Sequence, residues 1–149
     1  MFSGRFDYAV DDKGRVGLPA CVRDALKDEE HDTLFITNYV VSRQKVLQLF
    51  VPSEWQRLLA SLREKGRFNP DIQRFERFYI GGAHEVPVDK QGRILVPQRL
   101  RDYAGLRGEV TFSANHDHFE LWDKALLEKE LQASEELLMD PEFFSKLEI

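Results

Sequence analysis

The sequence predicts a mixed α/β, strand-rich fold in which one structural unit occurs twice within a single chain. The main observation is a repeat, because residues 10–26 return 78 positions later as residues 88–104 with seven of 17 positions identical. A block with helical periodicity lies between the copies, and a leucine-bearing segment follows the second. Two copies are too few for a solenoid. We therefore expect an intrachain pseudo-dimer with an inserted helical hairpin and a C-terminal helix.

Each copy begins with a strand, turns at a glycine and continues as a second strand that ends in proline. In the first copy, apolar residues alternate with polar or small ones over residues 6–11, which is the period of a half-buried strand. The dipeptide Lys13-Gly14 predicts a tight turn, after which a return strand begins. Pro19 suits the first turn of a short helix over 19–26, because its missing N–H would be unpaired there.

The second copy predicts the same elements, with strands over 85–89 and 93–96, a turn over 90–92 and a helix over 97–103. Two more strands flanking a polar turn follow each copy, at 33–37 and 46–50 in the first half and at 109–113 and 118–122 in the second. We therefore expect each repeat to consist of two short hairpins that bracket a short helix.

Helical periodicity marks three further segments. The first covers 53–65, where Ser53 and Gln56 predict a capping box and a glycine supplies the end. The second is capped by Asn69 and runs to the glycine pair after residue 80, and the third begins near Asp123. The predicted domain boundaries are 5–52 for repeat 1, 53–80 for the connecting helical hairpin, 81–124 for repeat 2 and 125–149 for an acidic helical tail.

The formal net charge of −5 is unevenly distributed. Residues 120–149 carry nine acids and three bases, whereas residues 1–119 carry 17 acids and 18 bases. The near-neutral body can therefore carry a local basic patch. No apolar run approaches the ~20 residues of a membrane helix, no secretory signal is visible at the start, and Cys21 is the only cysteine. These features indicate a cytoplasmic protein without an intrachain disulfide or a membrane partner.

The two turns carry the residues with the most chemical meaning. Lysine and arginine neutralise phosphates, and arginine also pairs in a bidentate manner with guanine O6 and N7. A rigid turn presenting such side chains can enter a groove of double-stranded DNA. The predicted DNA-binding residues are Lys13, Arg15, Gln91 and Arg93, and the predicted turn-supporting residues are Asp11, Gly14, Asp89 and Gly92.

A structural alternative exists for each of these residues. Asp and Arg four apart across a turn can form a surface ion pair worth only ~0–1 kcal/mol. Arg23 and Arg101, one turn into each short helix, could reach phosphates, but a solvated or Asp-paired face is the simpler interpretation. Arg74 and Arg77 lie between aromatic residues at helical spacing, which favours burial of those aromatics over stacking on nucleic acid.

No pattern indicates an enzyme. His116-Asp117-His118 resembles a metal-binding fragment, but the other two histidines show no spacing that would complete a site. Cys21 has no base placed near it in the sequence, so a nucleophilic role is unsupported. We expect no catalytic residue, no metal, no cofactor and no small-molecule substrate.

The motifs as a set resemble the MraZ family of bacterial regulators, which have two tandem SpoVT/AbrB-like half-domains. The resemblance covers nearly the whole chain and includes the opening Met1-Phe2-x-Gly4, both Asp-x-x-x-Arg motifs with their Gly-Arg-x-x-x-Pro continuations, Gly82-Ala83, and the segment 119–123. Two features depart from the family pattern. Gly17 stands where a β-favouring or polar residue is more common and is expected to loosen its strand. Lys13 becomes Gln91 in the second copy, so the first turn is expected to depend more on phosphate charge.

The resemblance implies a swapped-hairpin AbrB-like β-barrel made by the two halves of one chain. It also implies a ring-shaped homo-oligomer that binds repeated DNA sites, associates with the nucleoid and represses its own promoter upstream of cell-division and cell-wall genes. The alternative function is a protein-interaction module, antitoxin-like, that acts through the acidic C-terminal tail.

Overall fold

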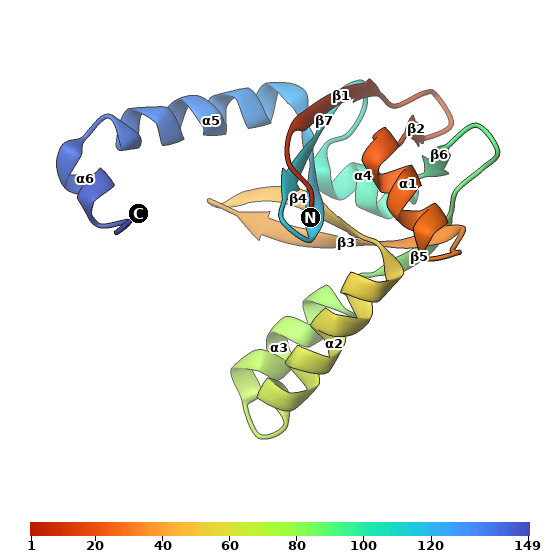
Figure 1. Ribbon diagram of the computed structural model, residues 1–149, viewed down its shortest axis with the longest axis horizontal. Coiled ribbons are helices and arrows are strands. Elements are labelled where there is room, and N and C mark those ends of the chain that lie inside the picture. The colour runs from red at the N-terminus through yellow and green to blue at the C-terminus, as the bar shows by residue number, and fades with distance from the viewer.

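The computed structural model describes residues 1–149 and contains eight strands and six helices (Figure 1). The strands are β1 (Arg5–Ala9), β2 (Arg15–Gly17), β3 (Thr33–Val41), β4 (Gln44–Phe50), β5 (His84–Pro87), β6 (Arg93–Leu95), β7 (Glu109–Asn115) and β8 (His118–Asp123). The helices are α1 (Ala20–Asp28), α2 (Pro52–Gly66), α3 (Pro70–Tyr79), α4 (Gln98–Ala104), α5 (Lys124–Leu138) and α6 (Pro141–Ser145). The predicted mixed α/β, strand-rich class is confirmed, and every predicted strand and helix has a counterpart.

One six-stranded antiparallel sheet, in the order β1-β7-β8-β4-β3-β5, contains strands of both repeats. From the first repeat, β1 pairs with β7 and β4 pairs with β8. From the second repeat, β5 pairs with β3. Twenty buried apolar residues drawn from both copies form one core cluster. The two repeats therefore share a core and fold as one unit.

Strands β1 and β2 form no ladder across the first turn, and across the second turn only one bridge, between Val88 and Ile94, is present, which corrects the first predicted hairpin of each repeat. Instead β2 pairs antiparallel with β6 of the other repeat, and Val16 lies opposite Ile94. Both side chains are 1% exposed. The physical reason is that β1 is already paired with β7, so the short strand β2 buries its apolar residue against its counterpart from the other copy.

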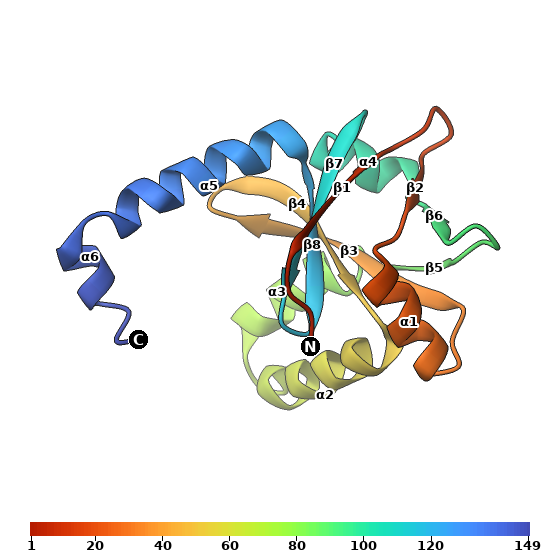
Figure 2. The ribbon, with the colours of Figure 1, turned by 45° about the horizontal axis from the view of Figure 1, so that its top comes forward.

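The strands do not close into a barrel. β1 and β5 are the two edges of the six-stranded sheet, and the β2–β6 pair forms a separate two-stranded sheet. The two small strands lie together at the end of the molecule from which the loops β1–β2 and β5–β6 project (Figures 1 and 2).

Gly17 does not loosen its strand, because a tyrosine ring occupies the space that a side chain would fill. A Cβ atom at residue 17 would lie 2.9 Å from Cε1 of Tyr8. The Tyr8 hydroxyl donates a hydrogen bond to the Leu18 carbonyl at 3.0 Å, and its ring meets Phe112 edge-on at a centroid distance of 5.6 Å. The glycine therefore allows β1 to pack closely against β2.

Helices α2 and α3 form a hairpin that projects away from the sheet (Figure 1). A second, aromatic core anchors it through four buried residues: Phe50, Trp55, Leu62 and Tyr79. The Asn69 cap is confirmed, since its side chain accepts hydrogen bonds from the N–H groups of Asp71 at 3.0 Å and Ile72 at 3.3 Å. The connection predicted as a helical hairpin is therefore one, and it packs on the strands of the first repeat.

The predicted capping box of α2 does not form. The helix begins one residue earlier, at Pro52, and its N-cap residue, Val51, makes no side-chain hydrogen bond to it. Ser53 instead donates its hydroxyl to Glu29 at 2.6 Å, and Glu29 also accepts from the Ser53 N–H at 3.1 Å. The carboxylate at the end of α1 outcompetes Gln56 because it engages both donors of the serine at once.

Helix α5 extends away from the body and is followed by the short helix α6 (Figure 1). Asp123 caps it by accepting from the Leu126 N–H at 3.1 Å, and Leu127 is its one buried residue. Several apolar side chains beyond this point are exposed: Leu137, Leu138, Met139, Phe144, Leu147 and Ile149. None of the helices combines the length and the apolar character needed to cross a bilayer.

Candidate nucleic-acid interface

The two turns have the same backbone geometry, which follows from the repeated sequence. In the first, the N–H of Gly14 donates to the Asp11 carbonyl at 2.9 Å, and the Asp11 N–H donates to the Arg15 carbonyl at 2.9 Å. The equivalent distances in the second turn are 3.0 and 2.9 Å. Gly14 and Gly92 have φ of 88° and 74°, a region in which a side chain is strained. The glycine in each turn is therefore required by the backbone.

Each aspartate supports its turn in two ways. One carboxylate oxygen of Asp11 accepts from the N–H groups of Lys13 at 2.9 Å and Arg15 at 2.8 Å, and the other accepts from Nε of Arg15 at 2.7 Å. Asp89 makes the same three bonds, at 2.9, 2.9 and 3.0 Å. The ion pair offered as the structural alternative is thus present, and it also orients the arginine.

These bonds favour the ionised carboxylates. The N–H group of Arg15 is the largest cause that lowers the pKa of Asp11, to about 2 from an ordinary value of 3.8. The equivalent N–H group of Arg93 lowers the pKa of Asp89 in the same way. Both aspartates are charged at neutral pH and are occupied with their own turns.

The bond to Nε leaves the outer edge of each guanidinium available. The two terminal nitrogens of Arg15 make no hydrogen bond within the chain, and its side chain is 37% exposed. Arg93 donates one terminal N–H to the Gln91 side chain at 3.1 Å. The first arginine is therefore free to form a bidentate pair with a planar acceptor, whereas the second has one nitrogen already engaged.

The β2–β6 pairing places the two arginines on one surface. Directly opposed residues of an antiparallel pair point to the same face, and alternate residues of a strand share a face. Arg15 lies opposite Leu95, and Arg93 lies opposite Gly17, so both arginines lie on the face away from the buried Val16. The structure thus brings together predicted site residues that are 78 positions apart in the chain.

One cation beside the second turn was missed in the sequence. Lys90 occupies the position of Asp12 in the repeat, so the second turn has a lysine where the first has an acid. With Arg23 and Lys27 of α1, Lys90 lines an open cleft of about 400 Å³ beside the second turn. An alignment of the two copies could have revealed Lys90, because it places this lysine opposite Asp12.

Arg23 and Arg101 form no ion pair with their neighbouring aspartates, and Arg23 is exposed, as the solvated alternative predicts, whereas Arg101 is half-buried. They lie over the turn glycines instead, since a Cβ at Gly14 would be 2.5 Å from Cζ of Arg101 and a Cβ at Gly92 would be 2.7 Å from Cδ of Arg23. This placement could not be read from the sequence, because each arginine covers the turn of the other copy.

The remaining candidates lie away from the turns. Tyr79 is buried, as predicted, whereas Phe75, which stacks on it at a centroid distance of 4.8 Å, is half-buried and Phe78 is 41% exposed. The ring of His118 stacks on Phe50 at 4.9 Å and its Nδ1 contacts Asp117 at 2.7 Å. No group of three or more histidine, cysteine or acidic side chains is arranged to hold a metal ion.

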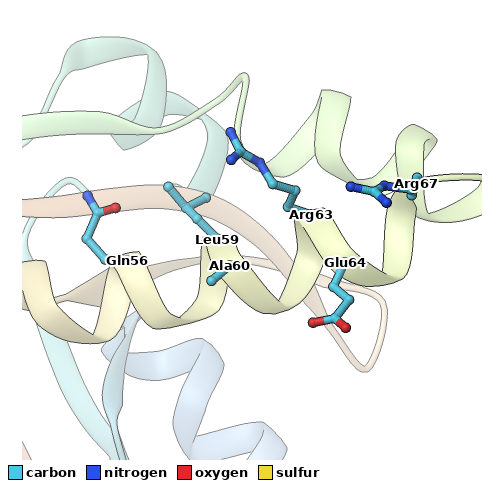
Figure 3. A pocket seen from close by; sticks show the side chains of 6 residues that line it. All are labelled: Gln56, Leu59, Ala60, Arg63, Glu64 and Arg67. Atoms are coloured by element: carbon cyan, nitrogen blue, oxygen red, sulfur yellow. The ribbon is translucent and has the colours of Figure 1, made fainter.

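A cavity of about 490 Å³ lies on α2, distant in the chain from either turn (Figure 3). Two of its six lining residues are apolar and four are polar or charged: Gln56, Leu59, Ala60, Arg63, Glu64 and Arg67. Arg63 and Glu64 point to opposite sides of the helix (Figure 3). The lining contains no serine, cysteine or histidine, so it offers no arrangement of nucleophile and base.

The fold and the paired turns define a class: a tandem-repeat protein in which two copies of a strand–turn–helix unit form an intrachain pseudo-dimer and present equivalent arginines on one surface. The family model described as "MraZ protein, putative antitoxin-like" matches residues 1–78 and 79–143. The boundary between the two matches falls between the two copies of the repeat. The chain belongs to the MraZ family.

Curated relatives agree with this assignment. The chain is 39% identical to the transcriptional regulator MraZ of Acetivibrio thermocellus over 125 residues, which are 84% of this chain and 82% of the relative. It is 35% identical to the protein of the same name from Coxiella burnetii, over 84% of this chain and 81% of the relative. The chain is also 32% identical to the transcriptional regulator MraZ of Desulfosudis oleivorans, over 99% of this chain and 97% of the relative.

Proposed function

We propose that this protein is a sequence-specific DNA-binding transcriptional regulator that reads promoter DNA with its two turns. The observation that carries the proposal is the pair of oriented arginines, Arg15 and Arg93, on one face of the β2–β6 sheet. The crossed pairing of β2 with β6 supports a swapped-hairpin arrangement of the two halves, which makes one chain present two reading elements.

The chemistry of the turns suits the major groove. Guanine offers O6 and N7 as two acceptors side by side, and a guanidinium held by its Nε can donate to both. Each aspartate acts as a carboxylate that fixes the arginine, so less rotamer entropy is lost on binding. Lys13 and Lys90 are exposed on their turns and can neutralise phosphates on either side.

Self-association would turn these contacts into tight binding. Six apolar residues of the tail are 41–94% exposed. The hairpin over 52–80 carries six bases and four acids, whereas residues 120–149 have a net balance of −6. We propose that such surfaces join several copies into a ring. Several subunits can then engage repeated DNA sites at once, and avidity compensates for the near-neutral body.

The regulated target is proposed from the family. Relatives carry the name transcriptional regulator, and the family resemblance points to repression at the protein's own promoter, upstream of cell-division and cell-wall genes. Binding there would associate the protein with the nucleoid.

The test is a gel shift with DNA from directly upstream of the protein's own gene and a scrambled duplex of equal length. Arg15→Ala and Arg93→Ala should each cost about 1–3 kcal/mol of binding free energy. Arg107→Ala removes an exposed arginine that makes no side-chain hydrogen bond or ion pair, and this variant should bind as the unmodified protein does. Affinity should fall steeply between about 50 and 200 mM salt. Equal binding to both duplexes, or full affinity in both turn variants, would contradict the proposal.

A protein-interaction function has its own support, because the family description includes the words antitoxin-like and the tail is acidic with exposed apolar residues. In this case a chain lacking residues 135–149 should lose its protein partners in a pull-down. Retention of the same partners by the shortened chain would dismiss this alternative.

A further inference from the structure

Each turn glycine is covered by an arginine from the opposite repeat. Arg101 of α4 lies so close to Gly14 that a Cβ there would be 2.5 Å from both Cζ and Nε of the arginine. Arg23 of α1, the equivalent residue of the first copy, lies over Gly92 in the same manner, with Cδ 2.7 Å from the position of a Cβ. The contact occurs twice in one chain, so it belongs to the repeat and not to one side chain's chance conformation.

Backbone hydrogen bonds follow the same crossed pattern. The carbonyl of Gly14 accepts from the Val96 N–H at 3.0 Å, and the carbonyl of Gly92 accepts from the Leu18 N–H at 3.0 Å. Each turn is therefore tied to the residue that lies two positions before the helix of the other copy. The arginine on that helix then covers the turn from outside.

The two contacts are not equally firm. Arg101 donates from Nε to the Val96 carbonyl at 2.9 Å, so it is anchored to the same residue whose N–H binds Gly14. The equivalent carbonyl in the first copy, that of Leu18, accepts from the Tyr8 hydroxyl instead. Arg23 has no such anchor and is exposed, whereas Arg101 is half-buried.

The glycines reflect this difference. Gly14 is buried beneath the anchored arginine, and Gly92 is half-buried beneath the unanchored one. Repeat 2 has Val86 at the position of Tyr8, which leaves the Val96 carbonyl free for Arg101. A single difference between the copies, tyrosine against valine, thus explains which arginine is anchored.

We propose that Arg101 and Arg23 are positioning residues that hold the turn of the opposite repeat, and that Arg101 holds the first turn more rigidly than Arg23 holds the second. The first turn then presents Arg15 in one fixed geometry, while the second turn adjusts to the DNA it meets. The consequence for DNA rests on the proposed function, whereas the holding of the turns does not.

The first experiment needs no DNA. Amide hydrogen exchange on the full chain should show faster exchange at residues 13–15 in Arg101→Ala and unchanged exchange at residues 91–93. Arg23→Ala should show faster exchange at residues 91–93, by a smaller factor, and unchanged exchange at residues 13–15. Arg101→Met keeps the aliphatic stem and removes the anchoring donor, so it tests the same contact if the alanine variant loses its fold. Arg107→Ala is the matched control, because it removes an exposed arginine just after the same helix.

Unchanged exchange at residues 13–15 in folded Arg101 variants would overturn the proposal, and so would equal changes at both turns. If the unmodified protein binds no DNA, the proposed function fails while this measurement still decides whether the arginines hold the turns.

The second experiment is a pair of double-mutant cycles on promoter DNA. Arg101→Ala and Arg15→Ala should be coupled, because removing Arg15 costs little further DNA affinity once Arg101 no longer holds the first turn. The departure from additivity should be at least about two-fold in Kd. Arg101→Ala and Arg93→Ala should be additive. A direct phosphate contact by Arg101 would instead lower the salt dependence by about one phosphate and give additivity with Arg15→Ala, which would overturn the positioning role.

Discussion

Val16 and Ile94 lie directly opposite each other in the β2–β6 pair, one from each copy of the repeat, and each is 1% exposed. The two residues occupy equivalent positions of the repeat, and they form the middle pair of the short sheet that joins the two halves. Neither copy can bury its own member without the other. The stability of both halves and the placement of both turns therefore depend on this contact.

Ile94→Ala should destabilise the whole chain by about 2–4 kcal/mol, because it removes buried apolar atoms and leaves a cavity between the repeats. Urea unfolding should show one transition at a lower midpoint. Leu95→Ala is the matched control, because Leu95 is next to Ile94 in the chain but is 53% exposed. This change in stability should stay within about 0.5 kcal/mol. Two separate transitions, or an equal loss in both variants, would argue against a shared core.

The turns should lose order in acid within a defined range. The folded pKa of Asp11 is about 2 and its ordinary value is 3.8, so the ionised carboxylate stabilises the turn above pH 4 and this contribution disappears as pH falls toward 2. Asp89 changes in the same direction. Carboxyl carbon shifts measured by NMR should show a midpoint near 2 for Asp11.

Asp11→Asn provides the control for that titration, because it should remove the low-pH change in the Arg15 amide shift while leaving the Arg93 amide unaffected. A midpoint of Asp11 at its ordinary value would show that the N–H groups of its turn do not bind the carboxylate in solution.

Gly17→Ala should destabilise the protein by about 1–3 kcal/mol, because the new Cβ would overlap the Tyr8 ring and the ring is held by its hydroxyl and by Phe112. Thermal unfolding measures the loss. At Gly108 a Cβ would meet nothing within 4 Å, so Gly108→Ala should be nearly neutral. Similar melting temperatures for the two variants would mean that Tyr8 does not pack on β2.

Removal of residues 139–149 should leave the body folded with its stability changed by less than about 0.5 kcal/mol. Helix α6 follows a helix whose one buried residue is Leu127, near its start, and the apolar residues beyond residue 136 are largely exposed. Circular dichroism melting of the shortened chain is the measurement. A large drop in melting temperature would show that the tail packs on the body.

The local chemistry of the turns could be predicted because all of its partners lie within five consecutive residues. Asp11 caps the turn and orients Arg15, Gly14 takes a positive φ, and the second copy repeats this with Asp89 and Gly92. The same holds for the Asn69 cap, whose acceptor and donors are two and three residues apart. The predicted capping box at Ser53 was wrong because the carboxylate of Glu29, which follows α1 and is 24 residues away, competed for the serine.

By itself, the sequence determined that one unit is used twice, that each copy presents an arginine at a glycine turn, and that a helical hairpin separates the copies. Periodicity and short-range hydrogen bonding are sufficient for these features. Only the tertiary structure decided which strand each copy pairs with, and that Arg101 covers Gly14 while Tyr8 fills the space at Gly17. Alternation shows which face of a strand is buried but not which partner buries it, since any strand of matching pattern could do so. The crossed pairing is selected by the shared core, where residues of both copies exclude water together.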